Sequence, residues 1–149
     1  MTDTTPLDAT SSPARSSRLL ASIKEREAGT LIERMQIEVT ELGPDRVVAT
    51  MPVAGNTQPA GLLHGGATAA LAETVGSYGA LAHAGAGRSA VGLELSVSHH
   101  RSARAGFVTA VASALHLGRT LASYEIVVTD EEGRRICTSR LTCMLIDER

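Results

Sequence analysis

The chain has 149 residues, 43% of them hydrophobic and 20% charged, so it is long enough to bury a sizeable core as a globular protein. Its net charge of -2 gives no reason to expect a nucleic-acid partner, and two Tyr, one Phe and no Trp make a poor platform for stacking single-stranded bases. No apolar run approaches the ~20 residues of a membrane span and none forms an N-terminal signal core, so we expect a cytoplasmic protein with no membrane partner.

The first half of the chain is expected to form a tail, a short helix and two strands. Residues 1–15 are rich in Thr, Ser, Asp, Pro and Ala, a composition typical of a disordered tail, and residues 16–149 are expected to form a single domain. Ser16 or Ser17 would cap a helix that runs through residue 28 and ends at Gly29. Alternating apolar residues then predict strands over residues 31–41 and 46–53.

The second half of the chain is expected to contain one long helix and four strands. A loop over residues 54–63 leads into an Ala- and Leu-rich helix that ends at about residue 83. The four predicted strands cover residues 89–101, 107–117, 120–129 and 135–146, and their short connections require antiparallel neighbours. The fold class is therefore α+β, with one antiparallel sheet of five or six strands wrapped around the long helix.

The long helix has two contrasting faces when its residues are placed at 100° per step. The expected core stripe consists of Leu71, Val75, Tyr78 and Ala82. The opposite face is small apart from one carboxylate, and consists of Gly66, Ala69, Ala70, Glu73, Gly76, Ser77 and Ala80. A solvated helix face usually carries several charges, so we expect a ligand or a second chain to enclose Glu73. The alternative is an ordinary exposed glutamate on an alanine-rich helix.

The segment that precedes this helix resembles the signature of a known enzyme family. The run Gln58-Pro-Ala-Gly-Leu-Leu-His-Gly-Gly66, followed by Glu73, is similar to hotdog-fold thioesterases of the PaaI-like group, which includes one class of 4-hydroxybenzoyl-CoA thioesterase. Residues 118–120 and 129–134 also resemble the family's last two hairpins, so the similarity covers roughly residues 30–146. It implies a hotdog fold, hydrolysis of acyl-CoA, no cofactor apart from the coenzyme A of the substrate, and a homodimer with shared active sites, often within a homotetramer.

Two residues carry the expected chemistry. The N–H of Gly65, at the positive end of the helix dipole, would stabilise the developing charge on the thioester oxygen. Glu73 would attack the carbonyl carbon or activate a water beside it, and the sequence does not separate these routes. The two residues are eight positions apart, about 12 Å along the helix, so both cannot contact one carbonyl group from the same chain. The site must therefore combine Gly65 of one subunit with Glu73 of another.

Four further residues have a functional and a structural interpretation. Gln58 resembles the family's amide that orients the nucleophile, water or thioester, although it is also plausible as a loop surface residue. Gly66 lacks a side chain and would let the acyl group approach the backbone, although paired glycines are also expected simply from a tight turn into a helix. His64 would shape the loop or donate a hydrogen bond near the thioester. Ser77 lies one turn after Glu73 and matches a family position that holds the water or carboxylate, but it is also simply small.

Coenzyme A would bring phosphates to the protein surface. Arg101, Arg104, Arg119 and Thr120 lie at expected strand ends and turns where they could bind these phosphates, although a single arginine in such a place is more often a solvated charge. No metal site is expected, because the adjacent His99 and His100 would point to opposite faces of a strand. Cys137 and Cys143 would lie about 20 Å apart on one strand, beyond disulfide reach, and are expected to be free thiols in a reducing compartment.

The sequence alone is consistent with three hypotheses about function. An acyl-CoA thioesterase is the first. A hotdog hydratase or dehydratase is the second, but neither the Asp-x-Asn-x-x-His motif nor a His near a Phe-Pro-Gly segment occurs. A non-catalytic acyl-CoA-binding protein is the third, although the regulators of that kind carry a DNA-binding domain for which about thirty preceding residues are too few. The acyl group, whether aryl, short or long, is left open.

Overall fold

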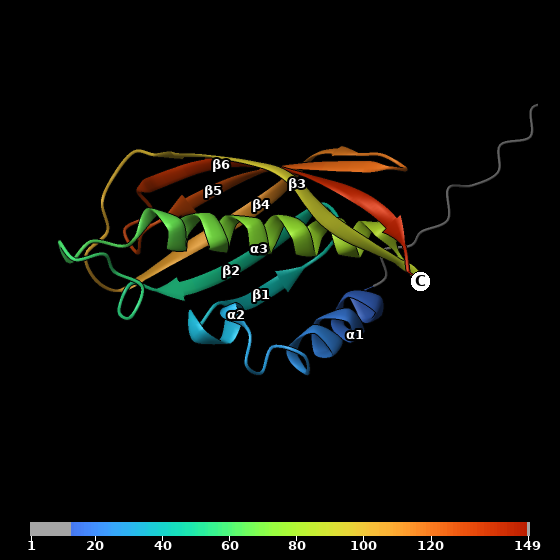
Figure 1. Ribbon diagram of the computed structural model, residues 1–149, viewed down its shortest axis with the longest axis horizontal. Helices are drawn as coiled ribbons and strands as arrows, with labels where there is room; N and C mark the ends of the chain where they lie inside the picture. Colours follow the sequence, from blue (N-terminus) through green and yellow to red (C-terminus); the bar gives the residue numbers. More distant parts are fainter. Residues whose placement is uncertain (1–12, 149) are drawn as a thin grey trace, which may run out of the picture.

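The structure is a computed structural model that describes residues 13–148, in which a curved sheet surrounds one long helix (Figure 1). In chain order the elements are α1 (Pro13–Lys24), α2 (Leu31–Arg34), β1 (Glu38–Leu42), β2 (Arg46–Pro52), α3 (Gly65–Ala84), β3 (Arg88–His99), β4 (Phe107–Leu117), β5 (Leu121–Thr129) and β6 (Arg135–Asp147). The predicted α+β architecture is confirmed.

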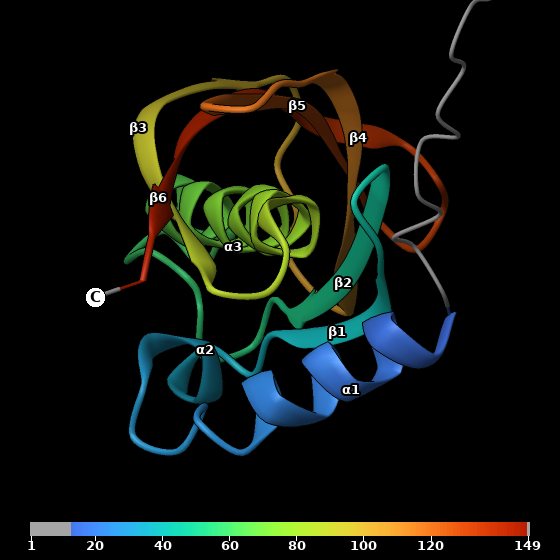
Figure 2. The same ribbon diagram turned by 90° about the vertical axis from the view of Figure 1, so that its right-hand side faces the viewer.

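The six strands form a single antiparallel sheet in the order β1-β2-β4-β5-β6-β3. The strand that follows α3 pairs with the last strand of the chain, which places β3 at one edge of the sheet and β1 at the other. Seen along α3, the sheet curls around the helix, while α1 and α2 lie on the side opposite β5 (Figure 2). Helix α3 is thus enclosed by its own chain on most sides, and β3 is left with one unpaired side.

Helix α3 is anchored to the sheet by a tightly packed seam. Leu71 and Val75 are fully buried, as predicted. Two glycines let the helix approach the sheet closely: a Cβ atom on Gly76 would stand 2.6 Å from Leu141 Cδ2, and one on Gly79 would stand 2.8 Å from the ring of Tyr124. The Tyr124 hydroxyl also donates to Pro44 O at 2.7 Å, which ties the centre of the sheet to the first hairpin.

The predicted division of α3 into a core stripe and a small-residue face is partly wrong. Gly76 and Ala80, placed on the free face, are buried inside the chain's own sheet, whereas Tyr78 and Ala82 are only partly buried. The physical reason is the curl of the sheet, which covers a wider arc of the helix than a flat sheet would. Gly66 and Glu73 are exposed, so the free face is narrower than expected but still carries the carboxylate.

The N-terminal segment differs most from expectation. Helix α1 begins at Pro13 rather than at Ser16 or Ser17 and ends at Lys24, while residues 1–12 of the expected tail lie outside the described part of the chain. The first half of the predicted strand over residues 31–41 is the short helix α2. Glu33 accepts a hydrogen bond from the Gly29 N–H at 2.6 Å and so holds this turn against the strand preference of Ile32. The other strand boundaries fall within two residues of the prediction.

Candidate active site

The loop before α3 is held by its own hydrogen bonds. The Gln58 N–H donates to Leu62 O at 2.8 Å, and Gly61, with φ of 75°, donates back to Gln58 O at 2.9 Å. The Asn56 side chain donates to Met35 O and to Pro52 O, both at 2.9 Å. These bonds join the loop to the segment after α2 and to the end of β2, and so determine where α3 begins.

His64 caps the N-terminus of α3. Its Nδ1 atom accepts a hydrogen bond from the Gly66 N–H at 2.8 Å, and its backbone is extended as a cap residue requires. A Cβ atom on Gly66 would stand 3.0 Å from that same Nδ1 atom, so a side chain there would crowd the cap. The N–H of Gly65 is in the first turn, has no acceptor within the helix, and meets no acidic side chain there. The end of α3 can therefore bind an oxyanion through Gly65.

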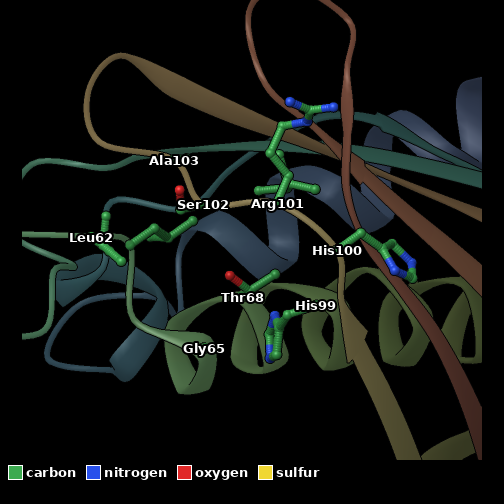
Figure 3. A pocket seen from close by; sticks show the side chains of 10 residues that line it. Leu62, Gly65, Thr68, His99, His100, Arg101, Ser102 and Ala103 are labelled. Carbon is green, nitrogen blue, oxygen red and sulfur yellow. The ribbon is translucent and has the colours of Figure 1, made fainter.

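A hollow of about 370 Å³ lies beside Gly65, between the start of α3 and the end of β3 (Figure 3). The side chains of Thr68 and His99 lie close together beside the first turns of α3, with Arg101 farther out in the same hollow (Figure 3). A Cβ atom on Gly65 would stand 2.9 Å from His99 Nε2, so this imidazole lies directly over the helix N-terminus. Sequence reasoning missed His99 and Thr68, because only the antiparallel course of α3 and β3 brings them to Gly65.

His100 follows the last residue of β3 and also lines the hollow, but its ring is paired with a neighbouring strand. Its Nε2 atom is 2.9 Å from Thr138 Oγ1 on the neighbouring strand β6. Within residues 13–148, no group of three or more His, Cys, Asp or Glu side chains is close enough to bind a metal ion. None of the described helices is long and apolar enough to cross a membrane.

Glu73 lies on the open side of α3, against the edge strand β3. Its side chain is exposed, and a Cβ atom on Gly92 would stand 3.0 Å from its Oε1 atom. Ser77 is one turn later on the same side of the helix, and both Ser77 and Glu73 lie near the thiol of Cys143. Burial raises the pKa of this thiol, a hydrogen bond with Ser77 lowers it, and the charge of Glu73 raises it further. Cys143 is the cross-strand partner of Gly92. Glu73, Ser77, Gly92 and Cys143 thus form one neighbourhood.

The remaining predicted residues are spread over the chain. Gln58 is half-buried, and its Oε1 atom accepts from the Ala60 N–H at 2.8 Å, which leaves the side-chain amide protons as the groups it can offer to a ligand. Gly65 and Glu73 remain about 12 Å apart on one helix and do not meet within a single chain.

The arginines expected to bind phosphate fall into three places. Arg101 lines the hollow beside Gly65. Arg104 lines a separate hollow together with Arg134 and the carboxylates of Asp130, Glu131 and Glu132, two of which pair with Arg134. Arg119 and Thr120 lie in the β4–β5 turn. His83 binds Gly118 O of that turn at 2.9 Å, so the turn adjoins the far end of α3, about 27 Å from Gly65.

The chain is similar to known thioesterases in sequence and in structure. Residues 60–137 match the family described as Thioesterase superfamily. "Proofreading thioesterase EntH" of Cronobacter turicensis is 52% identical over 124 residues, which are 83% of this chain and 90% of that protein. The crystal structure of a thioesterase from Haemophilus influenzae superposes with a TM-score of 0.81 at 37% identity, covering 86% of this chain and 90% of that one.

Two structures of a Staphylococcus aureus thioesterase enzyme are also similar, each 31% identical to this chain. Their TM-scores are 0.77 and 0.75, and they cover 80% and 78% of this chain and 100% and 98% of theirs. One carries a Glu-to-Ala substitution and the other a Gln-to-Ala substitution. The two substituted positions are 15 residues apart, and the same separation lies between Gln58 and Glu73.

Proposed function

This chain belongs to the thioesterase superfamily and is a thioester hydrolase, and we propose that it cleaves acyl-CoA to the free acid and CoA in an active site shared by two chains. The observation that carries the proposal is the separation of Gly65 and Glu73 on one straight helix, with Glu73 exposed beside an unpaired strand edge. Each chain therefore offers two half-sites that its own fold keeps apart.

A second copy is the partner that would complete both half-sites. Strand β3 has one unpaired side, and long unpaired edges with exposed apolar side chains are normally covered in native proteins. Val91 and Leu93 on this strand are 42% and 53% exposed. A two-fold axis near this edge would place Gly65 of one chain beside Glu73 of the other, twice per dimer. We further propose that two such dimers form a homotetramer, as the family resemblance implies.

The proposed chemistry uses a donor from one chain and a carboxylate from the other. The Gly65 N–H donates to the thioester oxygen and stabilises the negative charge that develops there. Glu73 either takes a proton from the attacking water or attacks the carbonyl carbon itself, forming an anhydride that water then hydrolyses. In both routes the C–S bond breaks and the CoA thiolate leaves. A single turnover in H₂¹⁸O can identify the second route, because only an anhydride opened at the Glu73 carbonyl carbon places a water oxygen in Glu73, and rapid-quench mass spectrometry detects an acyl group on Glu73 whichever carbonyl the water attacks.

Neighbouring residues would position these groups. The free amide protons of Gln58 would donate to the thioester or the water, and the spacing shared with the substituted residues of the S. aureus enzyme supports this pairing with Glu73. His64 would hold the helix N-terminus in place through its cap on Gly66, and Ser77 would orient the water or carboxylate. No cofactor is required beyond the coenzyme A of the substrate.

The nucleotide of coenzyme A would be bound by residues of more than one chain. Arg101 is next to Gly65 and can reach a phosphate from there, whereas Arg119 and Thr120 can do so only from another chain of the tetramer. Cys137 and Cys143 are both free and buried, and we place the enzyme in the reducing cytoplasm.

The test is release of free thiol from a panel of acetyl-, butyryl-, decanoyl-, palmitoyl- and benzoyl-CoA. Turnover of at least one substrate, lost in Glu73→Ala, is the expected result. The alternative is a non-catalytic acyl-CoA-binding protein. That alternative predicts saturable binding of acyl-CoA, measured by calorimetry, with no thiol released above the uncatalysed rate.

A further inference from the structure

We infer that the hollow between α1, α2 and α3 receives the far end of the acyl group, and that the preferred acyl group is a linear chain of about eight to ten carbons. This inference rests on the proposed function. It assigns a substrate class to a cavity that is separate from the hollow beside Gly65.

The hollow has a volume of about 290 Å³, and most of its lining surface is apolar. Ile23, Ile32, Leu81 and the ring of Tyr78 form its apolar walls, and Arg26, Glu27 and Thr30 complete the lining. An apolar protein cavity of about 150 Å³ is large enough to hold benzene. A chain of several methylene groups therefore fits in this hollow.

Tyr78 forms a partly buried wall of the hollow. Burial, assisted by the nearby charge of Glu27 and opposed by that of Arg26, raises the pKa of Tyr78 to about 12. The aromatic ring and the isoleucines present an apolar surface, on which each buried methylene group of a ligand would strengthen binding up to about fourfold.

A continuous row of α3 residues leads from the carboxylate to the hollow. Glu73, Ser77 and Leu81 are spaced four residues apart and so lie one above the next on the helix surface. Ser77 and Leu81 are both half-exposed, and Leu81 lines the hollow. An acyl chain whose carbonyl carbon is at Glu73 can extend along this row and enter the hollow beside Leu81.

The distance from Glu73 to Leu81 along this row sets the length of the acyl chain. Glu73 and Leu81 are eight residues apart, about 12 Å along the helix. An extended alkyl chain advances about 1.3 Å per carbon when C–C bonds of about 1.5 Å are staggered, so about nine carbons span the distance. A benzoyl group is too short to reach the hollow, and an acetyl group leaves it empty.

The N-terminal end of α3, away from the acyl hollow, is suited to the CoA half of the substrate. The hollow at the N-terminus of α3 contains Arg101, His99 and His100 and is the more polar environment of the two. A thioester held between the Gly65 N–H of one chain and Glu73 of the other would direct its CoA arm toward the first chain's Arg101 and its acyl chain along the second chain's α3.

The experiment compares a filled hollow with a matched control on the same short helix. We would measure kcat/KM for acyl-CoAs from acetyl to palmitoyl, below their micellar concentrations, in wild type, Ile32→Trp and Leu31→Trp. Ile32 lines the hollow, whereas its neighbour Leu31 is 61% exposed and does not. We expect Ile32→Trp to lower kcat/KM for decanoyl-CoA at least tenfold and to leave butyryl-CoA within twofold, with Leu31→Trp close to wild type on both.

Two results would overturn the inference: an equal loss on butyryl- and decanoyl-CoA in Ile32→Trp, or a wild-type enzyme that prefers butyryl-CoA to decanoyl-CoA. If Ile32→Trp does not fold, Tyr78→Ala provides the test. This substitution enlarges the hollow and should raise the ratio of palmitoyl- to decanoyl-CoA activity at least threefold. An unchanged ratio would contradict the inference. If the wild type releases no thiol at all, the proposed function fails. Calorimetric binding of decanoyl-CoA to wild type and Ile32→Trp then tests the hollow, with a tenfold weaker Kd expected and an equal Kd contradicting it.

Discussion

The carboxylate of Glu73 lies on the backbone of Gly92, in contact with the edge strand β3. A Cβ atom on Gly92 would stand 3.0 Å from Glu73 Oε1, and the pairing of β3 with β6 shifts register immediately after Gly92. The bulge and the missing side chain leave room for a charged group between helix and strand. Two distant parts of the sequence therefore determine the position of one carboxylate.

Substitution Gly92→Ala should displace the Glu73 carboxylate. The added methyl group would stand 3.0 Å from Oε1, so the carboxylate must shift by a few tenths of an ångström, and we expect kcat for the best acyl-CoA to fall about three- to tenfold with the protein still folded. Gly43→Ala is the matched control, because its Cβ atom would make an ordinary 3.5 Å contact with Arg46 O. An unchanged kcat in folded Gly92→Ala would show that the carboxylate position is not critical.

Replacement of the carboxylate itself should cost more. Glu73→Gln keeps the shape and removes the charge, and we expect kcat to fall about 10²–10⁴-fold, the range for a positioned acid or base group. Glu125→Gln is the control, since Glu125 is an exposed residue on strand β5, whereas Glu73 lies on helix α3. Hydrolysis by Glu73→Gln at a rate near wild type would exclude both proposed routes.

Mixed dimers should recover activity if the site is shared. Gly66→Val would push His64 off its cap, since even a Cβ atom there is 3.0 Å from Nδ1, and would disable the half-site at the helix N-terminus. When equal amounts of Gly66→Val and Glu73→Ala chains are refolded together, about half of the dimers are mixed. Each mixed dimer has one intact site out of two, so roughly a quarter of wild-type activity is expected. Mixed dimers verified by differential tags but inactive would argue for a site within one chain.

The reach of sequence reasoning is clear from particular residues. Helix α3 and strands β4 to β6 were predictable because their apolar periodicity is long and their turns are short. The faces of α3 were only partly predictable, because burial of Gly76 and Ala80 depends on how far the sheet curls around the helix. His99, Thr68 and Gly92 could not be assigned to the site, since each reaches it through the packing of β3 along α3.

His64 provides a prediction on stability. Its cap on the Gly66 N–H stabilises the first turn of α3, so His64→Ala should lower the free energy of unfolding by about 1 kcal/mol, whereas His64→Asn, which can cap through its amide oxygen, should lose much less. Urea unfolding followed by circular dichroism measures both. Equal losses in the two variants would mean that the ring contributes through packing rather than through the cap.

Stability should fall in alkaline solution, because four buried or half-buried groups hold their protons more tightly in the folded chain. Burial raises the pKa of the Cys137 and Cys143 thiols and of the Tyr124 phenol, and raises that of Tyr78 to about 12. A group whose pKa is higher in the folded state stabilises the fold fully below its unfolded pKa and loses this contribution as pH rises toward the folded value. The free energy of unfolding should therefore decline from about pH 8.5, where thiols begin to ionise in the unfolded chain.

Urea titrations at pH 7, 9 and 10.5 test this, and Cys143→Ala should show a shallower decline between pH 7 and 9 than wild type. A decline of the same steepness in that variant would place the alkaline sensitivity in other groups.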